Sequence, residues 1–393
     1  GGYSFVALNR TSYSGYNLGD DVQGPGLYSH VSVYDPHSMG YMTSKFSKAT
    51  VTHHYSNSLY LQDMVEFNEQ WKVLAALRYD FFRYMSASAT TPTGRREYEE
   101  HSSFNMIKNK ALTYRFGAVY LPHPNTSIYA SFASFFKPIR TFYQDNVIYV
   151  GNRFEPARNE EVFKPEKGYQ AEVGLKYQLN NILSANASLF YIRKMNSTAT
   201  LTNNYQVEEN GETTTMSVIG QVGVQDSKGF DFDVTLSPVS TLALTIGYGL
   251  NDSKIREMKE IKDPELIEAI YGNNPDETKQ QLNSQEGNWQ SNVPNQTFYA
   301  YGSYTIPRGV LKNLEFHLSS SYTGKVYRNT SNNSWFDPYW VTDFGMSYLL
   351  NNNIHLTFNL NNLFDNNYYN QALGQQMVPS MPRNFQVAIS YTL

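Results

Sequence analysis

Two aspartates, Asp231 and Asp233, are the best candidates in the sequence for acid–base chemistry. One residue separates them in a run that alternates between polar and apolar types, so on a β-strand both carboxylates would lie on the same face, roughly 7 Å apart. Paired carboxylates at that spacing would suit a hydrolase that uses one group as acid and the other as base. We favour the simpler interpretation, a polar lining of the sheet with Lys228 close by.

Adjacent histidines, His53 and His54, are a second place to look for chemistry. Both fall on a predicted strand, where successive side chains leave opposite faces, so they cannot easily chelate one metal ion. The chain has no cysteine and therefore no thiol chemistry. It also lacks a P-loop, a dinucleotide fingerprint, a nucleophile elbow and a zinc-ligand spacing. We therefore expect no enzymatic activity, no metal bound directly by protein side chains and no cofactor.

The composition favours a β-structure rather than a helical membrane protein. Of the 393 residues 40% are hydrophobic, but they form no run of 18 or more, which excludes helical membrane spans. A low mean hydropathy of -0.50 is still compatible with a membrane barrel, because only every second residue of a strand meets lipid. A net charge of -4 indicates no nucleic-acid partner. The first residues lack the features of a signal peptide, so either a signal was removed or the chain is a piece of a longer one.

The last part of the chain, 352–393, shows the strand pattern most clearly. In 354–361 and again in 385–393, apolar residues alternate strictly with small or polar ones, as expected when successive side chains leave opposite sides of a pleated strand. One face is therefore wholly apolar to the end of the chain. This is the pattern of a strand between lipid and a wet lumen.

The same alternation recurs along the chain in about fourteen strand-like runs. The hairpin over 168–194 is the cleanest, with a turn at Asn180-Asn181, and the next hairpin turns at Ser237-Pro238. Their apolar faces carry no charged residue, and a charge at the bilayer midplane would cost roughly 2–4 kcal/mol. The predicted strands are 2–10, 53–66, 70–84, 110–121, 126–136, 168–179, 183–194, 228–237, 240–250, 295–306, 313–323, 339–350, 353–363 and 384–393.

The connections between these strands alternate in length. Short turns are expected at 67–69, 122–124, 180–181, 237–238, 307–309 and 351–352. Long segments fall between them, at 11–52, 85–109, 137–167, 195–227, 251–294, 324–338 and 364–383. A globular domain rarely contains so many long loops. We therefore predict an all-β fold, a transmembrane antiparallel β-barrel with short periplasmic turns and long extracellular loops.

One long segment is expected to hold a short helix, over 263–272. Asp263 can cap its N-terminus, Pro264 suits the first turn and Gly272 suits the stop. We interpret this helix as loop packing, with a partner-binding helix as the alternative.

A series of short motifs then carries a resemblance that covers nearly the whole chain. The chain resembles the barrel of TonB-dependent outer-membrane siderophore receptors, because seven or more motifs of that family follow one another in the same order. They are Tyr60-Leu61-Gln62-Asp63, Leu77-Arg78-Tyr79-Asp80, Tyr129-Ala130-Ser131-Phe132 with Phe136-Lys137-Pro138, Lys164-Pro165-Glu166-Lys167-Gly168 with Glu172-Val173-Gly174, Ser227-Lys228-Gly229-Phe230, Val293-Pro294-Asn295, Asn361-Asn362-Leu363-Phe364-Asp365 with Tyr368-Tyr369, and Pro382-Arg383-Asn384.

The chain departs from that family in two respects. It ends on Leu393 where the family usually has an aromatic residue. It also shows neither the plug domain nor the energy-coupling box of the family, whose barrel has 22 strands. A barrel of fourteen strands would close at a radius of about 14 Å, too small to hold a plug of roughly 15 Å radius of gyration. The resemblance therefore implies that 1–393 is a single segment of a larger barrel, with the plug and about eight strands missing.

The resemblance implies a ferric siderophore as ligand, which would be held by aromatic walls and hydrogen-bond donors, with Arg or Lys for an anionic complex. The iron would arrive wrapped by its chelator. A plainer interpretation of each single aromatic is the girdle that anchors a barrel at the lipid headgroups, but as a set in outer loops we favour ligand capture. The candidates are Phe136, Arg140, Tyr143, Tyr149, Arg153, Trp289, Tyr327, Arg328, Trp335, Tyr368 and Tyr369.

The expected function is that of a receptor in the bacterial outer membrane. The resemblance implies that loops capture the chelate, that the missing plug seals the lumen, and that the TonB complex acts on the plug; the partners are thus outer-membrane lipid, the ferric siderophore and TonB. Other cargoes, such as haem, cobalamin or a glycan, remain open. A passive channel complete in 14 strands is the main alternative, and it predicts pairing of 2–10 with 384–393. An outer-membrane protease or lipase would need an acid–base constellation that the sequence lacks.

Overall fold

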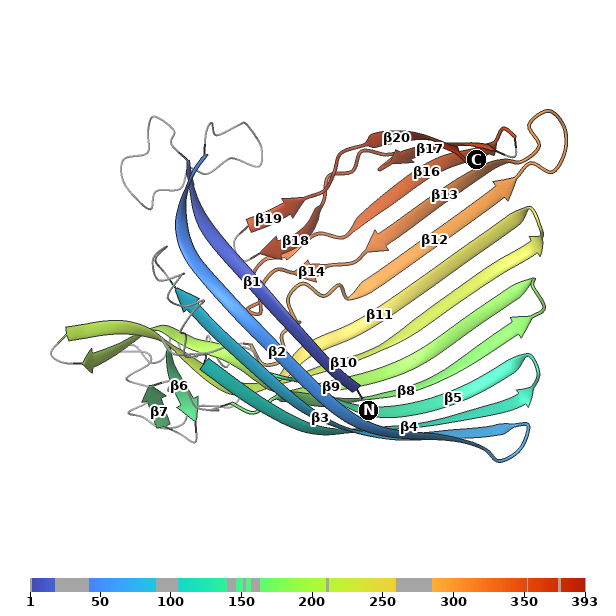
Figure 1. Cartoon of the computed structure of the whole chain (residues 1–393). Coiled ribbons are helices and arrows are strands. Elements are labelled where there is room, and N and C mark those ends of the chain that lie inside the picture. Colours follow the sequence, from blue (N-terminus) through green and yellow to red (C-terminus); the bar gives the residue numbers. More distant parts are fainter. Residues whose placement is uncertain are drawn as a thin grey trace.

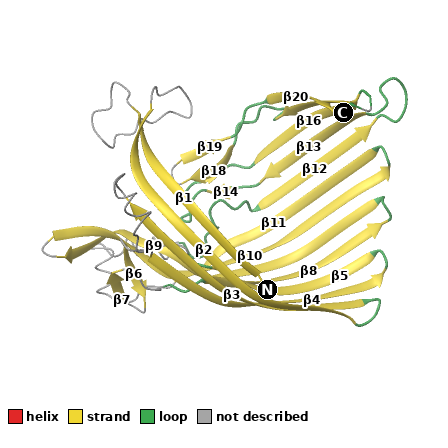
Figure 2. Cartoon of the chain, in the orientation of Figure 1, coloured by secondary structure: helices red, strands yellow, loops and turns green. Residues whose placement is uncertain are grey.

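The structure is a computed structural model that describes residues 2–17, 42–89, 105–139, 146–150, 153–156, 163–209, 212–258, 285–351, 353–373 and 376–392. Regular structure in these ranges is entirely β (Figure 2). None of the described segments is a helix with the length and apolarity to cross a membrane. The helix predicted over 263–272 lies outside the described residues.

Fourteen strands follow one another in a single antiparallel sheet that curves into a trough, with short connections along one rim and long ones along the other (Figure 1). All fourteen predicted strands are present, and short and long connections alternate, except that only residues 210–211 separate the strand that ends at Glu209 from the strand that begins at Glu212. The strands are β1 (Gly2–Asn17), β2 (Met42–Glu66), β3 (Trp71–Ala89), β4 (Asn105–His123), β5 (Thr126–Lys137), β8 (Glu166–Leu179), β9 (Leu183–Glu209), β10 (Glu212–Val239), β11 (Leu242–Met258), β12 (Gln296–Thr305), β13 (Leu314–Thr323), β16 (Tyr339–Leu349), β17 (Ile354–Asn361) and β20 (Asn384–Tyr391).

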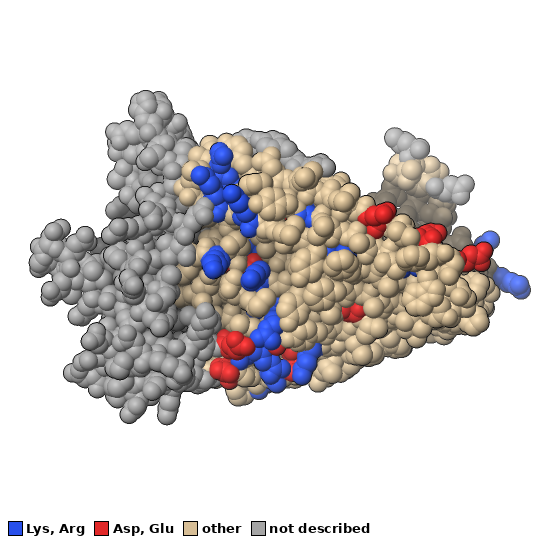
Figure 3. All heavy atoms as spheres, turned by 90° about the horizontal axis from the view of Figure 1, so that it is seen from below, with Lys and Arg blue, Asp and Glu red and all other residues tan. Residues whose placement is uncertain are grey.

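The register of the sheet puts the apolar residues of all strands on one face. Phe230 of β10 lies opposite Leu189 of β9, and Phe358 of β17 lies opposite Val387 of β20. Leu189 and Val387 are exposed, at 58% and 63%, and Phe230 and Phe358 are partly exposed. A large apolar face without a covering layer is what a lipid-facing wall requires, and it is the convex face of the trough. Figure 3 shows a broad area of this face with almost no charge.

The concave face is polar, and its aromatic rings cover glycines of the neighbouring strands. A Cβ atom at Gly229 would meet the carbonyl oxygen of Leu250 and would come within 2.5 Å of the ring of Phe190. At Gly174 it would come within 2.5 Å of the ring of Tyr129. Glycine lets each ring lie flat on the adjacent backbone. Both glycines belong to the motifs that carry the family resemblance, so packing of the wall explains them.

Asp231 and Asp233 lie on this polar face, as the alternation predicts. Asp233 accepts a hydrogen bond from Asn186 at 2.8 Å. The expected proximity of Lys228 is wrong, because Lys228 lies on the opposite face, where its Nζ is 3.6 Å from a carboxylate oxygen of Asp252. An odd separation along a strand reverses the face, which is why Lys228 cannot accompany the two aspartates.

Several strands run further outward than their apolar alternation indicates, and β9 and β10 extend the furthest. The segment 195–227, predicted as a loop, continues β9 and β10 as paired strands up to Glu209 and Glu212. The prediction of a loop is wrong because a ribbon outside lipid is wet on both faces and needs no apolar alternation. Threonines such as Thr198 and Thr200 still favour extended backbone there.

The turn between β10 and β11 also differs from the prediction. It lies at Ser240-Thr241, and Ser237-Pro238 instead forms an irregularity in the pairing, between Leu236 and Val239. Proline has no N–H to donate to a ladder, and a bulge is one of the few strand positions that accept it. The turn at Asn180 is confirmed, with a positive φ of 47°.

Six short strands occupy the predicted long segments. β6 (Asn146–Val150) pairs with β7 (Arg153–Pro156) and, in parallel, with β10. Two separate hairpins are formed by β14 (Val326–Tyr327) with β15 (Trp335–Phe336) and by β18 (Tyr369–Leu373) with β19 (Gln376–Pro379).

The ends of the strand order are not joined. In the described residues β1 pairs with β2 alone and β20 with β17 alone. Figure 1 shows the two edges apart. A complete 14-stranded channel predicts pairing of 2–10 with 384–393; the described part of these two segments shows no such pairing, so this alternative is not supported.

Candidate ligand-binding rim

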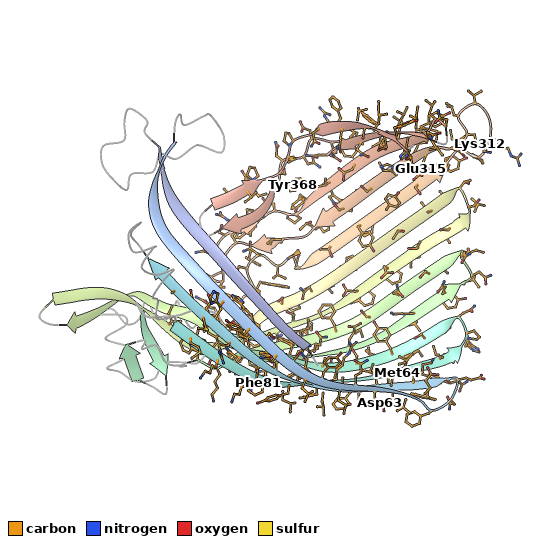
Figure 4. All side chains as sticks on the ribbon, in the orientation of Figure 1. Asp63, Met64, Phe81, Lys312, Glu315 and Tyr368 are labelled. Carbon is orange, nitrogen blue, oxygen red and sulfur yellow. The ribbon has the colours of Figure 1, made fainter. Side chains whose placement is uncertain are left out.

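Six of the predicted ligand residues meet at the rim that carries the long segments. They come from three pieces of chain: residues 285–295 before β12, residues 324–338 with the β14–β15 hairpin, and residues 362–383 with the β18–β19 hairpin. Figure 4 shows Tyr368 at this end of the sheet and Lys312 at the opposite rim. The six are Trp289, Tyr327, Arg328, Trp335, Tyr368 and Tyr369.

The β14–β15 hairpin holds a lysine against two aromatic rings. Lys325 Nζ lies 3.9 Å from the ring centroid of Trp335 and 4.5 Å from that of Tyr327. The two rings are 6.4 Å apart and nearly perpendicular, and Trp335 is 47% exposed. Since a cation on an aromatic face is held by the quadrupole of the ring, this hairpin presents a fixed positive charge between accessible aromatic surfaces.

Arg328 lies on the other side of the same hairpin. Its guanidinium carbon is 5.6 Å from the centroid of the buried Phe336, and its Nη1 donates to Ser334 Oγ at 3.0 Å. Its Nε is buried, and among the described residues it has no hydrogen-bond acceptor. Arg328 thus keeps one donor for an acceptor that the described residues do not supply.

Residues 285–295 are attached to this hairpin through Trp289. The backbone N of Trp289 donates to Asn332 Oδ1 at 2.7 Å, and Asn332 Nδ2 donates to the carbonyl oxygen of Trp289 at 2.9 Å. Asn288 Nδ2 donates to the carbonyl oxygen of Thr330 at 2.9 Å. Lys254 Nζ lies 4.8 Å from the ring centroid of Trp289. The two loops therefore form one unit.

The tyrosines of residues 362–383 stack on the same unit. The rings of Tyr339 and Tyr368 are 4.2 Å apart and nearly parallel, at 17°. Phe336 and Tyr369 are 5.7 Å apart at 22°. Tyr339 shares the polar face of β16 with Asp343, so Tyr368 stacks on the lumen side and not on the lipid side. Burial, followed by the nearby Tyr339 and Asp343, raises the pKa of Tyr368, which keeps its phenol neutral.

A buried asparagine fixes where this segment leaves the sheet. Asn362 is 4% exposed, and its backbone N donates to Asp343 Oδ1 at 2.8 Å. Its side chain exchanges hydrogen bonds of 2.9 Å with the backbone of Asn366. Where the segment returns, Arg383 N donates to Asp365 Oδ1 at 2.7 Å. The motifs at 361–365 and 382–384 are thus the two ends of one hydrogen-bonded clamp.

The structure does not place the other five predicted ligand residues in this cluster among the residues that it describes. Phe136 lies on the apolar face of β5, in line with Phe132, away from the lumen. Tyr149 is on β6 and Arg153 on β7, a hairpin placed beside β10, and their side chains are not described. Arg140 and Tyr143 lie outside the described residues.

Sequence reasoning missed Lys325, Phe336, Tyr339 and Asn332. Lys325 could have been found, because it is two residues from Tyr327 and an extended chain puts both on one side. Asn332 could only have been marked as a turn residue, and its φ of +56° agrees with that role.

The described residues also show no candidate site for a metal ion bound directly by protein side chains. The described residues contain no group of three or more His, Asp or Glu that could hold a metal ion. Of the adjacent histidines, His54 packs edge-on against the rings of Phe82 and Tyr84, at 5.9 and 4.9 Å.

Comparison with known proteins agrees with the family resemblance found in the sequence. Residues 2–363 match the model of the family described as TonB dependent receptor-like, beta-barrel. The chain is 25% identical over 383 residues to a probable TonB-dependent siderophore receptor, PiuA, of Acinetobacter baumannii, with 92% of this chain and 46% of that protein aligned. It is 26% identical over 335 residues to the metal-pseudopaline receptor CntO of Pseudomonas aeruginosa, with 85% and 40% aligned.

Solved structures show the same fold. The crystal structure of PiuA from Acinetobacter baumannii superposes with a TM-score of 0.68 at 21% identity, over 99% of this chain and 52% of that one. The ferric-catecholate import receptor Fiu of Escherichia coli K12 gives 0.67 at 18% identity, over 99% and 51%. The chain thus spans about half the length of the proteins that it matches. The fold of this chain, with the rim cluster, thus matches one part of each of these larger structures.

Proposed function

Because the chain belongs to the TonB-dependent receptor β-barrel family, we propose that it is part of an outer-membrane receptor that imports a ferric siderophore, with energy supplied through TonB. Members of this family are receptors and transporters and not enzymes. In the whole protein, a plug outside this chain would seal the lumen and connect the ligand to TonB. The segment 1–393 contributes wall and outer loops.

The ligand proposal rests on one observation: three loops join to form a rim that is both aromatic and cationic. Lys325 supplies a positive charge beside the exposed ring of Trp335, and Tyr339 and Tyr368 add a stacked pair on the lumen side. A ferric chelate is bulky and oxygen-rich and is often anionic. The aromatic surfaces would contact the body of the chelate, and the lysine cation would attract its negative charge. Both groups lie at the rim where a ligand would enter from outside.

The class of chelator is a separate question. One relative is described as a probable TonB-dependent siderophore receptor and another as a metal-pseudopaline receptor. We therefore keep a ferric siderophore as the main proposal and another metal–chelator complex as the second. The two share the requirement for a rim that binds a large anionic chelate.

Binding to the full-length receptor tests the role of the rim. The variant Tyr327→Ala/Trp335→Ala removes both rings from Lys325, and we expect at least tenfold weaker binding of the preferred chelate from a panel of ferric catecholates, ferric hydroxamates and other metal chelates. Trp340→Ala is the matched control, because Trp340 is equally exposed, at 47%, but faces the apolar side of β16. Equal losses in both would assign the rim aromatics to membrane anchoring.

Transport is tested in cells. Uptake of radiolabelled iron from the chelate is expected to stop in a strain without TonB, while binding at the cell surface continues. Uptake that persists without TonB would contradict the proposed energy source. Absence of the protein from the outer-membrane fraction would contradict the proposed location.

A further inference from the structure

The strands that carry the rim cluster have no basic residue. β12, β13, β16 and β17 contain neither Lys nor Arg, and their only carboxylates are those of Glu315 and Asp343. Residues 285–295 lead into β12, the β14–β15 hairpin lies between β13 and β16, and residues 362–383 follow β17. The three loops of the rim are thus mounted on strands with almost no charge, and we call the concave face of these four strands the neutral wall.

Hydroxyl groups make up much of the neutral wall. Tyr299 and Tyr301 of β12 are 46% and 39% exposed, and they lie in register with Ser321 and Ser319 of β13. Ser303 continues the row toward the short turns. Each of these hydroxyls can both donate and accept a hydrogen bond. A molecule that moves along this face therefore meets equivalent partners at successive levels.

Glycines make the neutral wall smooth. A Cβ atom at Gly247 would collide with the ring of Tyr299, and one at Gly345 would collide with the ring of His317. Because these two positions lack a side chain, both rings can lie against the backbone of the neighbouring strand. Flat rings leave the space above the wall open to a bulky ligand.

Neither carboxylate of these strands leaves a free charge in the middle of the wall. Asp343 accepts hydrogen bonds from the backbone N of Asn362 at 2.8 Å and from Ser319 Oγ at 3.5 Å. Glu315 is the second residue of β13 and lies next to a short turn. Figure 4 shows Glu315 near the rim of the short turns and Tyr368 near the rim of the long segments. Asp343 is thus engaged within the wall, and Glu315 marks its inner end.

The concave face of β3, β4, β5 and β8 differs, because it carries charges of both signs. Lys72, Arg115, Glu172 and Lys176 all lie on it, and they line a hollow of about 410 Å³. Lys176 Nζ is 5.3 Å from the ring centroid of Tyr129. A hydrogen bond to a charged group is roughly twice as strong as one between neutral groups. An anion on this side would therefore be held at the basic groups and repelled by the carboxylate.

We infer that the neutral wall is the path along which the chelate moves from the rim to the periplasmic end, an inference that rests on the proposed function. Passage requires a ligand to bind strongly enough to enter and weakly enough, at many similar places, to leave. The hydroxyls of β12 and β13 meet this requirement for an oxygen-rich, anionic chelate, and the charged side does not. The path begins beside Lys325, which is two residues beyond Thr323, the last residue of β13.

The test uses the full-length receptor in cells, with a radiolabelled ferric catecholate of net negative charge as the probe. Two quantities are measured: the affinity of surface binding in a strain without TonB, and the maximum rate of uptake in a strain with TonB. In Ser303→Arg we expect an affinity within about twofold of the wild type and an uptake rate lower by at least about fivefold, because the added cation would hold the anion on its path. Ser303→Gln, which is similar in length but uncharged, is expected to retain at least about half of the wild-type rate.

Two further variants make the result specific to the neutral wall. Ser321→Arg places the same group on β13 and is expected to behave as Ser303→Arg does, so the test does not depend on the folding of one variant. Ser131→Arg is the matched control, because Ser131 is a serine of the concave face of β5 that lies opposite Glu172 on the charged side. Its uptake rate is expected to stay within about twofold of the wild type.

Each contrary outcome has a definite meaning. Wild-type uptake rates in Ser303→Arg and Ser321→Arg, or an equal loss in Ser131→Arg, would overturn the neutral wall as the path. A loss in Ser303→Gln as large as that in Ser303→Arg would overturn the role of charge. If the wild type itself takes up no iron from any chelate of the panel, the proposed function fails and the path fails with it. Uptake by the wild type that neither wall variant lowers would count against the path alone.

Discussion

Trp289 and Asn332, which are 43 positions apart in the sequence, hold each other through two hydrogen bonds, of 2.7 and 2.9 Å, between the backbone of the tryptophan and the amide of the asparagine. One side chain thereby satisfies a donor and an acceptor of a neighbouring loop, and it joins residues 285–295 to the β14–β15 hairpin. The position of Trp289 at the rim therefore depends on a residue that need not touch the ligand.

We expect Asn332→Ala to release Trp289 and to weaken chelate binding by about 1–3 kcal/mol, the cost of leaving polar backbone groups without partners. Hydrogen exchange at the Trp289 amide should accelerate in the same variant. Asn333→Ala is the control, because among the described residues the Asn333 side chain accepts a hydrogen bond from Asn329 alone, within the same turn. If binding and exchange are the same in both variants, the two loops are not coupled through Asn332.

The stacked pair Tyr339 and Tyr368 should act as one unit in binding. A double-mutant cycle with Tyr339→Leu and Tyr368→Leu is expected to give a coupling of about 0.5–1.5 kcal/mol in chelate affinity, the usual value for aromatic pairs beyond area burial. Independent effects that simply add would mean that the stack does not position either ring for the ligand.

Gly229 should not tolerate a side chain. An added Cβ would meet the Leu250 carbonyl oxygen and the Phe190 ring, so we expect Gly229→Ala to lower the free energy of unfolding by about 1–3 kcal/mol. Gly117→Ala is the control on the same polar face, because the nearest atom to its added Cβ is at 3.8 Å. The denaturation midpoint in lipid vesicles measures both, and equal midpoints would contradict the packing account.

The two faces of β12 should differ in their tolerance of charge. Ala300 lies opposite Ile246 on the apolar face, and Ser303 lies on the polar face. We expect Ala300→Arg to cost about 2–4 kcal/mol of folding stability in a bilayer and Ser303→Arg to cost much less. Folding yields into vesicles at increasing denaturant give the comparison. A greater loss for Ser303→Arg would reverse the assignment of the faces.

The clamp at Asn362 should control residues 362–383 as a whole. Asn362→Ala leaves the backbone N–H and carbonyl oxygen of Asn366 short of partners, and we expect about 1–3 kcal/mol of destabilisation together with weaker chelate binding. Gln178→Ala, at the opposite rim, loses only one exposed contact of 3.4 Å and serves as control. An unchanged protease sensitivity of 364–383 in Asn362→Ala would contradict this role.

The sequence predicted the wall better than the rim, for physical reasons. Where lipid meets one face and water the other, alternation is obligatory, so strands such as 354–361 could be found directly. Beyond the lipid both faces are wet, and the continuation of β9 to Glu209 left no such signal. The rim depends on contacts between loops, such as Asn332 with Trp289, which no local pattern encodes. The sequence could have predicted that Phe136 points away from the lumen, because it is four residues from Phe132 and so shares its face of the strand.

The unjoined edges of β1 and β20 determine how residues 1–393 would behave when they are isolated. Each edge presents a row of backbone N–H and C=O groups without partners among the described residues. Inside a bilayer such groups cannot be hydrated, and in water they are templates for another chain. Copies of this segment kept apart from any completing strands would therefore add to one another edge to edge, and such a preparation would report on self-assembly and not on recognition.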